Sequence, residues 1–421
     1  MCGIAGYIGK KKLSEGIINK TLKKMKNRGP DNLSHVLLNI ENNKKFVSFF
    51  HSRLSIIDLN NRATQPFVFQ NLTCIFNGEI YNYIEIKKDL RSKGYEFKTL
   101  SDTEVLIKAY HYYGKKCTEY FEGMWAFAIY DDISKKIFIS RDRFGEKPVY
   151  YYLDNVNQRF AFGSEIKFIK NMLPDKKFNI DEEYMKEFLV LGHKNLYKDS
   201  NKCSFYKNIS EIKPGENVTI CLNLKLFKEK YWSPLLNIQE GYSRNYWIGK
   251  TKESLIKSLE LRMRADVPLS FCLSGGIDSG SLVSIASKVL NKRDIYTFSI
   301  IDSDQRYNES EQIKTIIKDT KCKNYPIKLE KSDYFDQMYR LSSYRNGPIA
   351  TSSYFVHSLL IEKISSLGFK IAMSGVGADE IFTGYFDHFS YFLKFLKNKN
   401  SNKFLNALKE WEKYVKPNIR N

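Results

Sequence analysis

The sequence predicts two folds in series: an α+β region of antiparallel sheets, followed by an α/β region with a doubly wound parallel sheet. The first prediction rests on short, aromatic-rich strand patterns between turns, from residue 2 to about residue 222. The second rests on a regular alternation of helix and strand patterns beyond residue 232. We therefore expect domains at 1–210 and 233–421, joined by a junction at 211–232 that contains Lys213, Pro214 and Gly215.

The first region contains more strand patterns than helix patterns. Its strands are expected at residues 46–57, 72–76, 125–130, 136–140 and 149–153, and its helices chiefly at 83–93 and 103–113.

The second region alternates regularly. Helices are expected at 252–264, 279–290, 309–319 and 354–366, and strands at 267–273, 295–300, 323–328 and 370–374. Ligands of such sheets bind at the carboxyl ends of the strands.

Composition limits the classes of protein to consider. The 421 residues are 43% hydrophobic and 14% aromatic, which is typical of a globular chain of two or three domains. Its lysines are dispersed, so the net charge of +20 argues for a solvated surface and an acidic nucleotide substrate rather than for nucleic-acid binding. The seven cysteines form no C-x-x-C pair, and no apolar run is long enough for a membrane span. We expect a protein of the reducing cytoplasm, and the sequence leaves a homodimer open.

Cys2 is the first candidate for catalysis. Removal of Met1 would leave it with both a thiol and a free α-amino group, so that nucleophile and base would lie on one residue. An early cysteine alone is more often an incidental small apolar residue.

Four further strings lie at intervals after Cys2. They are Arg-Gly-Pro-Asp at 28–31, His-Ser-Arg-Leu-Ser-Ile at 51–56, Asn-Gly-Glu-Ile-Tyr-Asn at 77–82 and Ser-Asp-Thr-Glu at 101–104. In this order they resemble the glutamine amidotransferase domain of the class that uses an amino-terminal cysteine. The resemblance extends to 141–145 and 163–167, and it implies an Ntn-type αββα sandwich.

The resemblance also implies roles for these residues in hydrolysis of the glutamine side-chain amide. Cys2 would attack, and the Asn77 side chain with the Gly78 N–H would form the oxyanion hole. Arg53 would bind the carboxylate of glutamine, because a guanidinium can do so bidentately. Glu79 and Asp102 would bind its ammonium group, with main-chain groups near Ile57 assisting.

Each string has a plainer interpretation. Asn77 and Gly78 are a frequent hairpin pair, Ser101 and Glu104 form a capping box, and Arg53 could be a surface ion-pair partner.

Two loops follow apolar strands in the second region. Ser-Gly-Gly-Ile-Asp-Ser at 274–279 is a glycine turn before a helix, where N–H groups and the helix dipole suit pyrophosphate. It resembles the pyrophosphate loop of the ATP pyrophosphatases (adenine nucleotide alpha-hydrolase-like), and it lacks the lysine of a P-loop. The second loop, at 374–380, should meet the first at the same sheet edge. The resemblance implies that ATP contacts Leu273, Ser274, Gly275, Gly276, Asp278, Ser279, Ile300, Ser374 and Gly375, and that Mg²⁺ is held by Asp278 and Asp379.

An amidotransferase before a pyrophosphatase is the architecture of glutamine-dependent asparagine synthetases, which this chain resembles. The resemblance implies that ammonia from glutamine attacks an acyl-adenylate of aspartate, giving asparagine, AMP and pyrophosphate. Relatives commonly carry an acidic residue where this chain has Val376, so amidation of a uronic acid for a surface polysaccharide is an alternative. Relatives also continue well past residue 421, so the synthetase region is expected to be incomplete, as a fragment or a naturally short form. Glutaminase activity alone is the third alternative.

Overall fold

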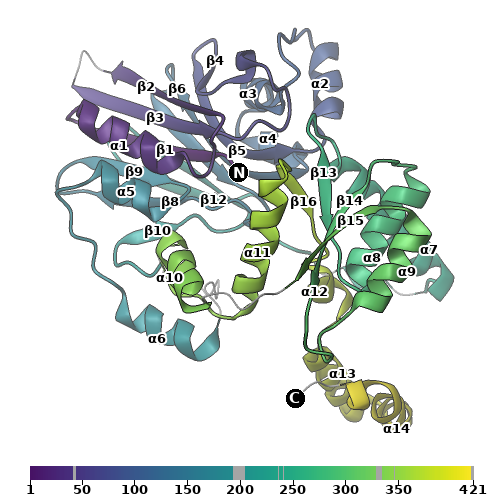
Figure 1. The fold of residues 1–421 in the computed structure, drawn as a ribbon. Coiled ribbons are helices and arrows are strands. Elements are labelled where there is room, and N and C mark those ends of the chain that lie inside the picture. The colour runs from purple at the N-terminus through teal and green to yellow at the C-terminus, as the bar shows by residue number, and fades with distance from the viewer. Residues whose placement is uncertain are drawn as a thin grey trace. The chain divides into compact units, whose positions relative to one another are not determined.

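The computed structural model describes residues 1–40, 44–192, 204–235, 237–239, 241–328, 334–345 and 347–418 (Figure 1). The chain forms two compact units. One is Met1–Pro268 with Lys331–Glu362, and the other is Leu269–Glu330 with Lys363–Asn421. Within the described ranges, no helix is long and apolar enough to cross a membrane.

Two antiparallel six-stranded sheets form the centre of the first unit. One sheet has the order β10 (Ile209–Glu211), β8 (Tyr150–Asp154), β9 (Arg159–Gly163), β1 (Gly3–Gly9), β3 (Lys45–Arg53), β2 (Asn32–Ile40). The other has the order β12 (Leu226–Lys230), β11 (Glu216–Cys221), β7 (Lys136–Arg141), β6 (Gly123–Asp131), β5 (Leu72–Ile80), β4 (Phe67–Phe69).

The two sheets pack face to face between layers of helices. Ile4 and Phe49 of the first sheet share one buried cluster with Ile75 and Ile139 of the second, because alternate residues of a strand face the same side. Helices α1 (Glu15–Met25) and α5 (Ile166–Met172) cover the outer face of the first sheet. Helices α2 (Tyr83–Ser92), α3 (Asp102–Tyr113) and α4 (Cys117–Tyr120) cover the outer face of the second. The expected αββα sandwich is confirmed.

Four further helices belong wholly or largely to this unit: α6 (Glu182–Leu191), α7 (Arg244–Arg262), α10 (Tyr334–Arg345) and α11 (Ser353–Ser366). Helix α10 packs on the sandwich, since the ammonium of Lys167 lies 4.2 Å from the centre of the Tyr344 ring.

The second unit contains a four-stranded parallel sheet. Its order is β15 (Lys323–Lys328), β14 (Tyr296–Ile301), β13 (Leu269–Cys272), β16 (Ile371–Met373). The helices of the unit are α8 (Ile277–Ser284), α9 (Ser310–Thr320), α12 (Ala378–Phe382), α13 (Phe386–Lys399) and α14 (Ser401–Glu410). Phe271, Val283, Phe298 and Ile313 are buried in its core. The expected parallel α/β fold is confirmed.

Several predicted elements differ in extent. The strand predicted at 46–57 ends at Arg53, and 54–57 is loop. Helix α7 begins at Arg244, eight residues before its predicted start, because the Ser243 hydroxyl caps it by accepting the Tyr246 N–H at 3.2 Å. Part of the predicted junction forms β11 and β12 of the second sheet. The domain boundaries at 210 and 233 stay a prediction.

Candidate active sites

Cys2 lies immediately before β1, and contacts from two other segments fix it. The Leu54 N–H donates to its Sγ at 3.3 Å. Arg28 donates from Nε to the Cys2 carbonyl at 2.9 Å and forms a 3.0 Å ion pair with Glu165. Arg28 and Glu165 belong to strings that carried the resemblance, although the sequence suggested no role for either. Here Arg28 holds the main chain of Cys2, and Glu165 holds Arg28.

The electrostatics around Cys2 favour a neutral amine. Burial raises the pKa of the Cys2 thiol above its usual value. Burial, together with the charges of Arg28 and Lys147, lowers the pKa of the Met1 amino group to about 6. This favours the neutral form of the Met1 amine near neutral pH, and a neutral amine is the form that can accept a proton from a thiol.

Asn77 is completely buried in β5, and neither polar atom of its amide has a hydrogen-bond partner among the described residues. Such groups are rare in folded proteins because leaving one unpaired is costly. Phe76, which precedes Asn77, contacts β3 through its carbonyl oxygen, because His51 Nε2 lies 3.2 Å from Phe76 O. His51 in turn pairs with Ile4 of β1, two residues after Cys2.

Gly78 continues β5, which corrects the hairpin interpretation of this pair. A Cβ at residue 78 would lie 2.1 Å from Met124 O and 2.7 Å from Trp125 Cα of β6, so only glycine fits this contact between the strands.

Glu79 and Asp102 lie together in a buried acidic cluster. Burial and the neighbouring Asp102 raise the pKa of Glu79 to about 7. Burial raises the pKa of Asp102 to about 6, although its carboxylate accepts the Ile80 N–H at 3.1 Å. A cationic group entering this cluster would favour the ionised forms of both.

Asp102 begins α3 behind the N-cap Ser101, whose hydroxyl accepts the Thr103 N–H at 3.1 Å. The predicted capping box is only half right. Glu104 instead accepts the Thr99 N–H at 2.7 Å and pairs with Lys108 at 2.7 Å.

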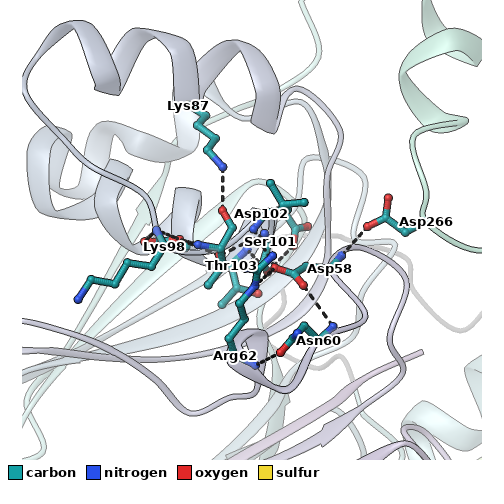
Figure 2. A network of polar contacts seen from close by, with 12 residues as sticks. Asp58, Asn60, Arg62, Lys87, Lys98, Ser101, Asp102, Thr103 and Asp266 are labelled. Carbon is teal, nitrogen blue, oxygen red and sulfur yellow. Dashed lines mark hydrogen bonds and ion pairs between the residues drawn. The ribbon is translucent and has the colours of Figure 1, made fainter.

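The loop after β3 holds Arg53. Its guanidinium donates to the carbonyls of Asn60, at 2.9 Å, and Asp58. Arg53 is buried and has no carboxylate partner among the described residues, so the surface ion-pair interpretation is wrong. Ile57 is also buried in this loop. Figure 2 shows the polar contacts that surround the Asp58 turn.

Lys147 is a charged residue that the sequence interpretation missed. It is buried, and burial lowers the pKa of its ammonium, which lies in the field of Glu79 and Glu146. The Asp142 carboxylate holds its main chain by accepting the Lys147 N–H at 2.9 Å. The signal was a lysine directly before a Pro-Val pair at a strand start, two residues after the string at 141–145.

The glycine turn of the second unit is stabilised by its own serines. The Ser274 N–H donates to the Ser279 hydroxyl at 3.0 Å, and the two hydroxyls lie 2.9 Å apart. The N-cap Gly276 supplies no side-chain hydrogen bond to α8, so no cap competes for its first-turn N–H groups. Glu309, which the sequence interpretation missed as a contact, accepts the Gly275 N–H at 2.9 Å.

The second loop meets the first, as the parallel topology predicted. A Cβ at Gly375 would lie 2.9 Å from Asp278 Cβ and 3.0 Å from Ser279 N. Leu273 is buried beneath the turn, and Ile300 lies near the end of β14. Ser374 and Val376 are exposed on the second loop, Val376 to 77%. Asp379 is the second residue of α12, and no group of three or more potential metal ligands occurs among the described residues.

Comparison with known proteins agrees with the family resemblance of both regions of the chain. A family model described as "Glutamine amidotransferase domain" matches residues 1–232, and one described as "Asparagine synthase" matches residues 250–417. The putative glutamine-hydrolysing asparagine synthetase 2 of Methanocaldococcus jannaschii is 32% identical over 420 residues, which cover 94% of this chain and 78% of that protein. The chain belongs to the family of glutamine-hydrolysing asparagine synthetases. Within that family it is 29% identical to asparagine synthetase 1 of Bacillus subtilis, over 91% of this chain and 59% of the relative.

The chain is shorter than several members of this family. It spans between 52% and 63% of three asparagine synthetases of B. subtilis. Among solved structures, the glutamine phosphoribosylpyrophosphate amidotransferase of B. subtilis is similar, with a TM-score of 0.39 and 16% identity over 89% of this chain and 93% of that chain.

Membership confirms, at the level of the family, the predicted class of carbon–nitrogen ligase with glutamine as nitrogen donor.

Proposed function

We propose that this chain hydrolyses glutamine at Cys2 and uses the ammonia to amidate a carboxylate at the expense of ATP, with AMP and pyrophosphate as products. The observation that carries the proposal is the buried, unpartnered amide of Asn77. A donor kept without a partner costs stability, and it gains one when an oxyanion forms beside it. Membership in the synthetase family supplies the second half of the reaction.

In the first unit, loss of Met1 leaves the α-amine on Cys2 itself. That amine takes the thiol proton, and the thiolate attacks the side-chain carbonyl of glutamine. The Asn77 amide and the Gly78 N–H stabilise the oxyanion, and ammonia leaves before water releases glutamate.

The substrate is recognised at its two charged ends. Arg53, which carbonyls fix and which meets no carboxylate in the described part of the chain, binds the carboxylate of glutamine. Glu79 and Asp102 bind its ammonium group. Burial raises the pKa values of both carboxyl groups, and the positive charge of the ammonium would stabilise their ionised forms. Main-chain groups near Ile57 complete the site.

In the second unit, the turn at 274–279 fits the pyrophosphate part of ATP. Support comes from the uncapped start of α8 and from the close approach of Gly375 to Asp278, which a larger residue would prevent. Leu273, Ile300, Ser374 and Gly375 contact the adenylate in this proposal. Asp278 and Asp379 hold Mg²⁺, because carboxylates together with phosphate oxygens are its usual ligands.

Aspartate is the first acceptor to test, as the family name indicates. A uronic acid is the second candidate, because Val376 is exposed and apolar on the loop where relatives commonly carry an acid. A valine can neither pair with the ammonium group of aspartate nor transfer a proton.

The test uses the full chain, with an N-terminal Cys2 verified by mass spectrometry. Wild type should release glutamate from glutamine, and Cys2→Ala should not. Both should form AMP and pyrophosphate from ATP when supplied with ammonia, Mg²⁺ and the correct acceptor, because the second site does not need Cys2. Nucleotide turnover with aspartate but not with uronate sugars excludes the uronic acid. Glutamate release without nucleotide turnover in an acceptor screen would favour the glutaminase-only alternative.

A further inference from the structure

The segment 262–266, here called the clasp, begins at the last residue of α7 and ends three residues before the start of β13. The asparagine synthase family match at 250–417 includes the clasp, yet the clasp lies in the compact unit that holds Cys2. Its contacts within that unit are mainly to strings that bind glutamine in the proposed function or directly follow them, and Arg262 also lies 3.5 Å from Glu122. This distribution raises the question of which reaction the clasp serves.

One end of the clasp is bonded to the loop that follows Arg53. The Asp266 carboxylate accepts the Asp58 N–H at 2.8 Å, and the Asp266 N–H donates to Ile56 O at 2.9 Å. These two reciprocal bonds bracket Ile57. Figure 2 shows Asp266 beside the Asp58 turn, together with Asn60 and Arg62.

Asp58 transmits this contact to Arg53. The backbone of Asp58 has a positive φ of 50°, which is uncommon for a residue other than glycine and must be stabilised by surrounding contacts. The buried Asp58 side chain is held by the N–H groups of Leu100, at 2.8 Å, and Asn60, at 3.2 Å. Its carbonyl accepts from the Arg53 guanidinium. The direction of that guanidinium therefore depends on where the Asp58 peptide lies.

The other end of the clasp is bonded to the string that contains Glu79. Arg264 donates to Tyr81 O at 2.8 Å and pairs with both carboxylate oxygens of Glu85, at 2.6 and 2.7 Å. The Arg262 guanidinium lies 4.9 Å from the centre of the Tyr81 ring. The clasp thus contacts both strings whose charged residues bind the ends of glutamine.

We propose that Asp266 is a positioning residue for glutamine binding, acting through the Asp58 turn on Arg53, although its place in the sequence assigns it to the synthetase region. The inference rests on the proposed glutaminase function. It predicts an effect on glutamine affinity rather than on turnover, because among the described residues the clasp contacts neither Cys2 nor Asn77. Small displacements of a substrate-positioning group are sufficient to weaken binding.

The experiment measures glutamate release from L-glutamine by the full chain with a verified N-terminal Cys2. Asp266→Ala removes the acceptor for the Asp58 N–H and should raise KM for glutamine about three- to tenfold, with kcat within about twofold of wild type. Asp266→Asn keeps an acceptor oxygen and should stay within about twofold of wild type in KM. Glu253→Gln is the matched control, because this exposed acid on α7 pairs with Lys250 of the same helix and should change neither constant.

A second variant guards against a general loss of folding. Arg264→Met removes the bonds to Tyr81 and Glu85 and should also raise KM more than it lowers kcat. Melting temperatures of all variants accompany the kinetics. An Asp266→Ala protein with wild-type KM, or with kcat lowered and KM unchanged, overturns the inference alone. A wild-type protein that releases no glutamate overturns both the inference and the proposed function.

Discussion

Asn77→Ala should separate catalysis from stability. In the described part of the chain the Asn77 amide is buried with both polar atoms unpaired, which costs about 1–3 kcal/mol. Truncation removes that cost and leaves a small cavity, whose penalty is of the same order. The two contributions oppose each other, so the melting temperature should stay within about 4 °C of wild type.

The effect on rate should be much larger. Loss of one oxyanion donor costs about 2.7–4 kcal/mol, or on the order of 10²- to 10³-fold in kcat. The assay is the initial rate of glutamate formation over a range of glutamine concentrations, with thermal unfolding of the same samples. Asn77→Asp is the control that keeps the size of the side chain. A carboxylate cannot donate a hydrogen bond, so this variant should be as inactive as Asn77→Ala. A kcat within threefold of wild type would refute the assignment of Asn77. A low kcat with a melting temperature lowered by more than about 10 °C would show that Asn77 supports the fold instead.

Two further predictions concern pH and the nucleotide loop. The folded protein raises the pKa of Glu79 from 4.5 to about 7, so between these values the folded state holds a proton that the unfolded chain has lost. The contribution of this group to stability therefore falls as pH rises from about 4.5 to 7, while the ionised form that attracts the ammonium of glutamine grows. KM for glutamine should rise by up to about tenfold per pH unit below pH 7, and a flat profile, or an unchanged slope in Glu79→Gln, would contradict this. Gly375→Ala places a Cβ 2.9 Å from Asp278 Cβ and 3.0 Å from Ser279 N. It should reduce ammonia-dependent AMP formation at least about tenfold while glutamate release persists, whereas Gly249→Ala, where a Cβ meets nothing within 4 Å, should change neither.

The order of elements was predictable because it depends on local patterns. Alternating apolar residues marked most strands, and the Ser-Gly-Gly sequence at 274–276 marked the turn after β13. The helix α1 was missed, although Ser14 caps it by accepting the Ile17 N–H at 3.4 Å. It follows a lysine-rich loop and has only a short apolar face.

What could not be predicted depends on long-range contacts. The Asn-Gly pair at 77–78 has the local signature of a turn, and only the packing of β5 on β6 makes it strand. Arg28, Lys147 and Asp266 lie far from Cys2 in sequence or beyond its domain match, and nothing local distinguishes them from surface charges. Arg28 and Lys147 stand out through their burial, and the exposed Asp266 through its hydrogen bonds to the main chain of residues 56 and 58.

The most direct test of the central claim follows the nitrogen. Full-length protein with an N-terminal Cys2 is given amide-¹⁵N-glutamine, ATP, Mg²⁺ and either L-aspartate or a uronate sugar, and the products are resolved by mass spectrometry. We expect ¹⁵N in the amide of one acceptor, with one AMP and one pyrophosphate for each amide formed, and no label transfer in Cys2→Ala. Release of ¹⁵N-ammonia and glutamate with no labelled amide and no AMP, under conditions in which added ammonia is also not incorporated, would contradict the account.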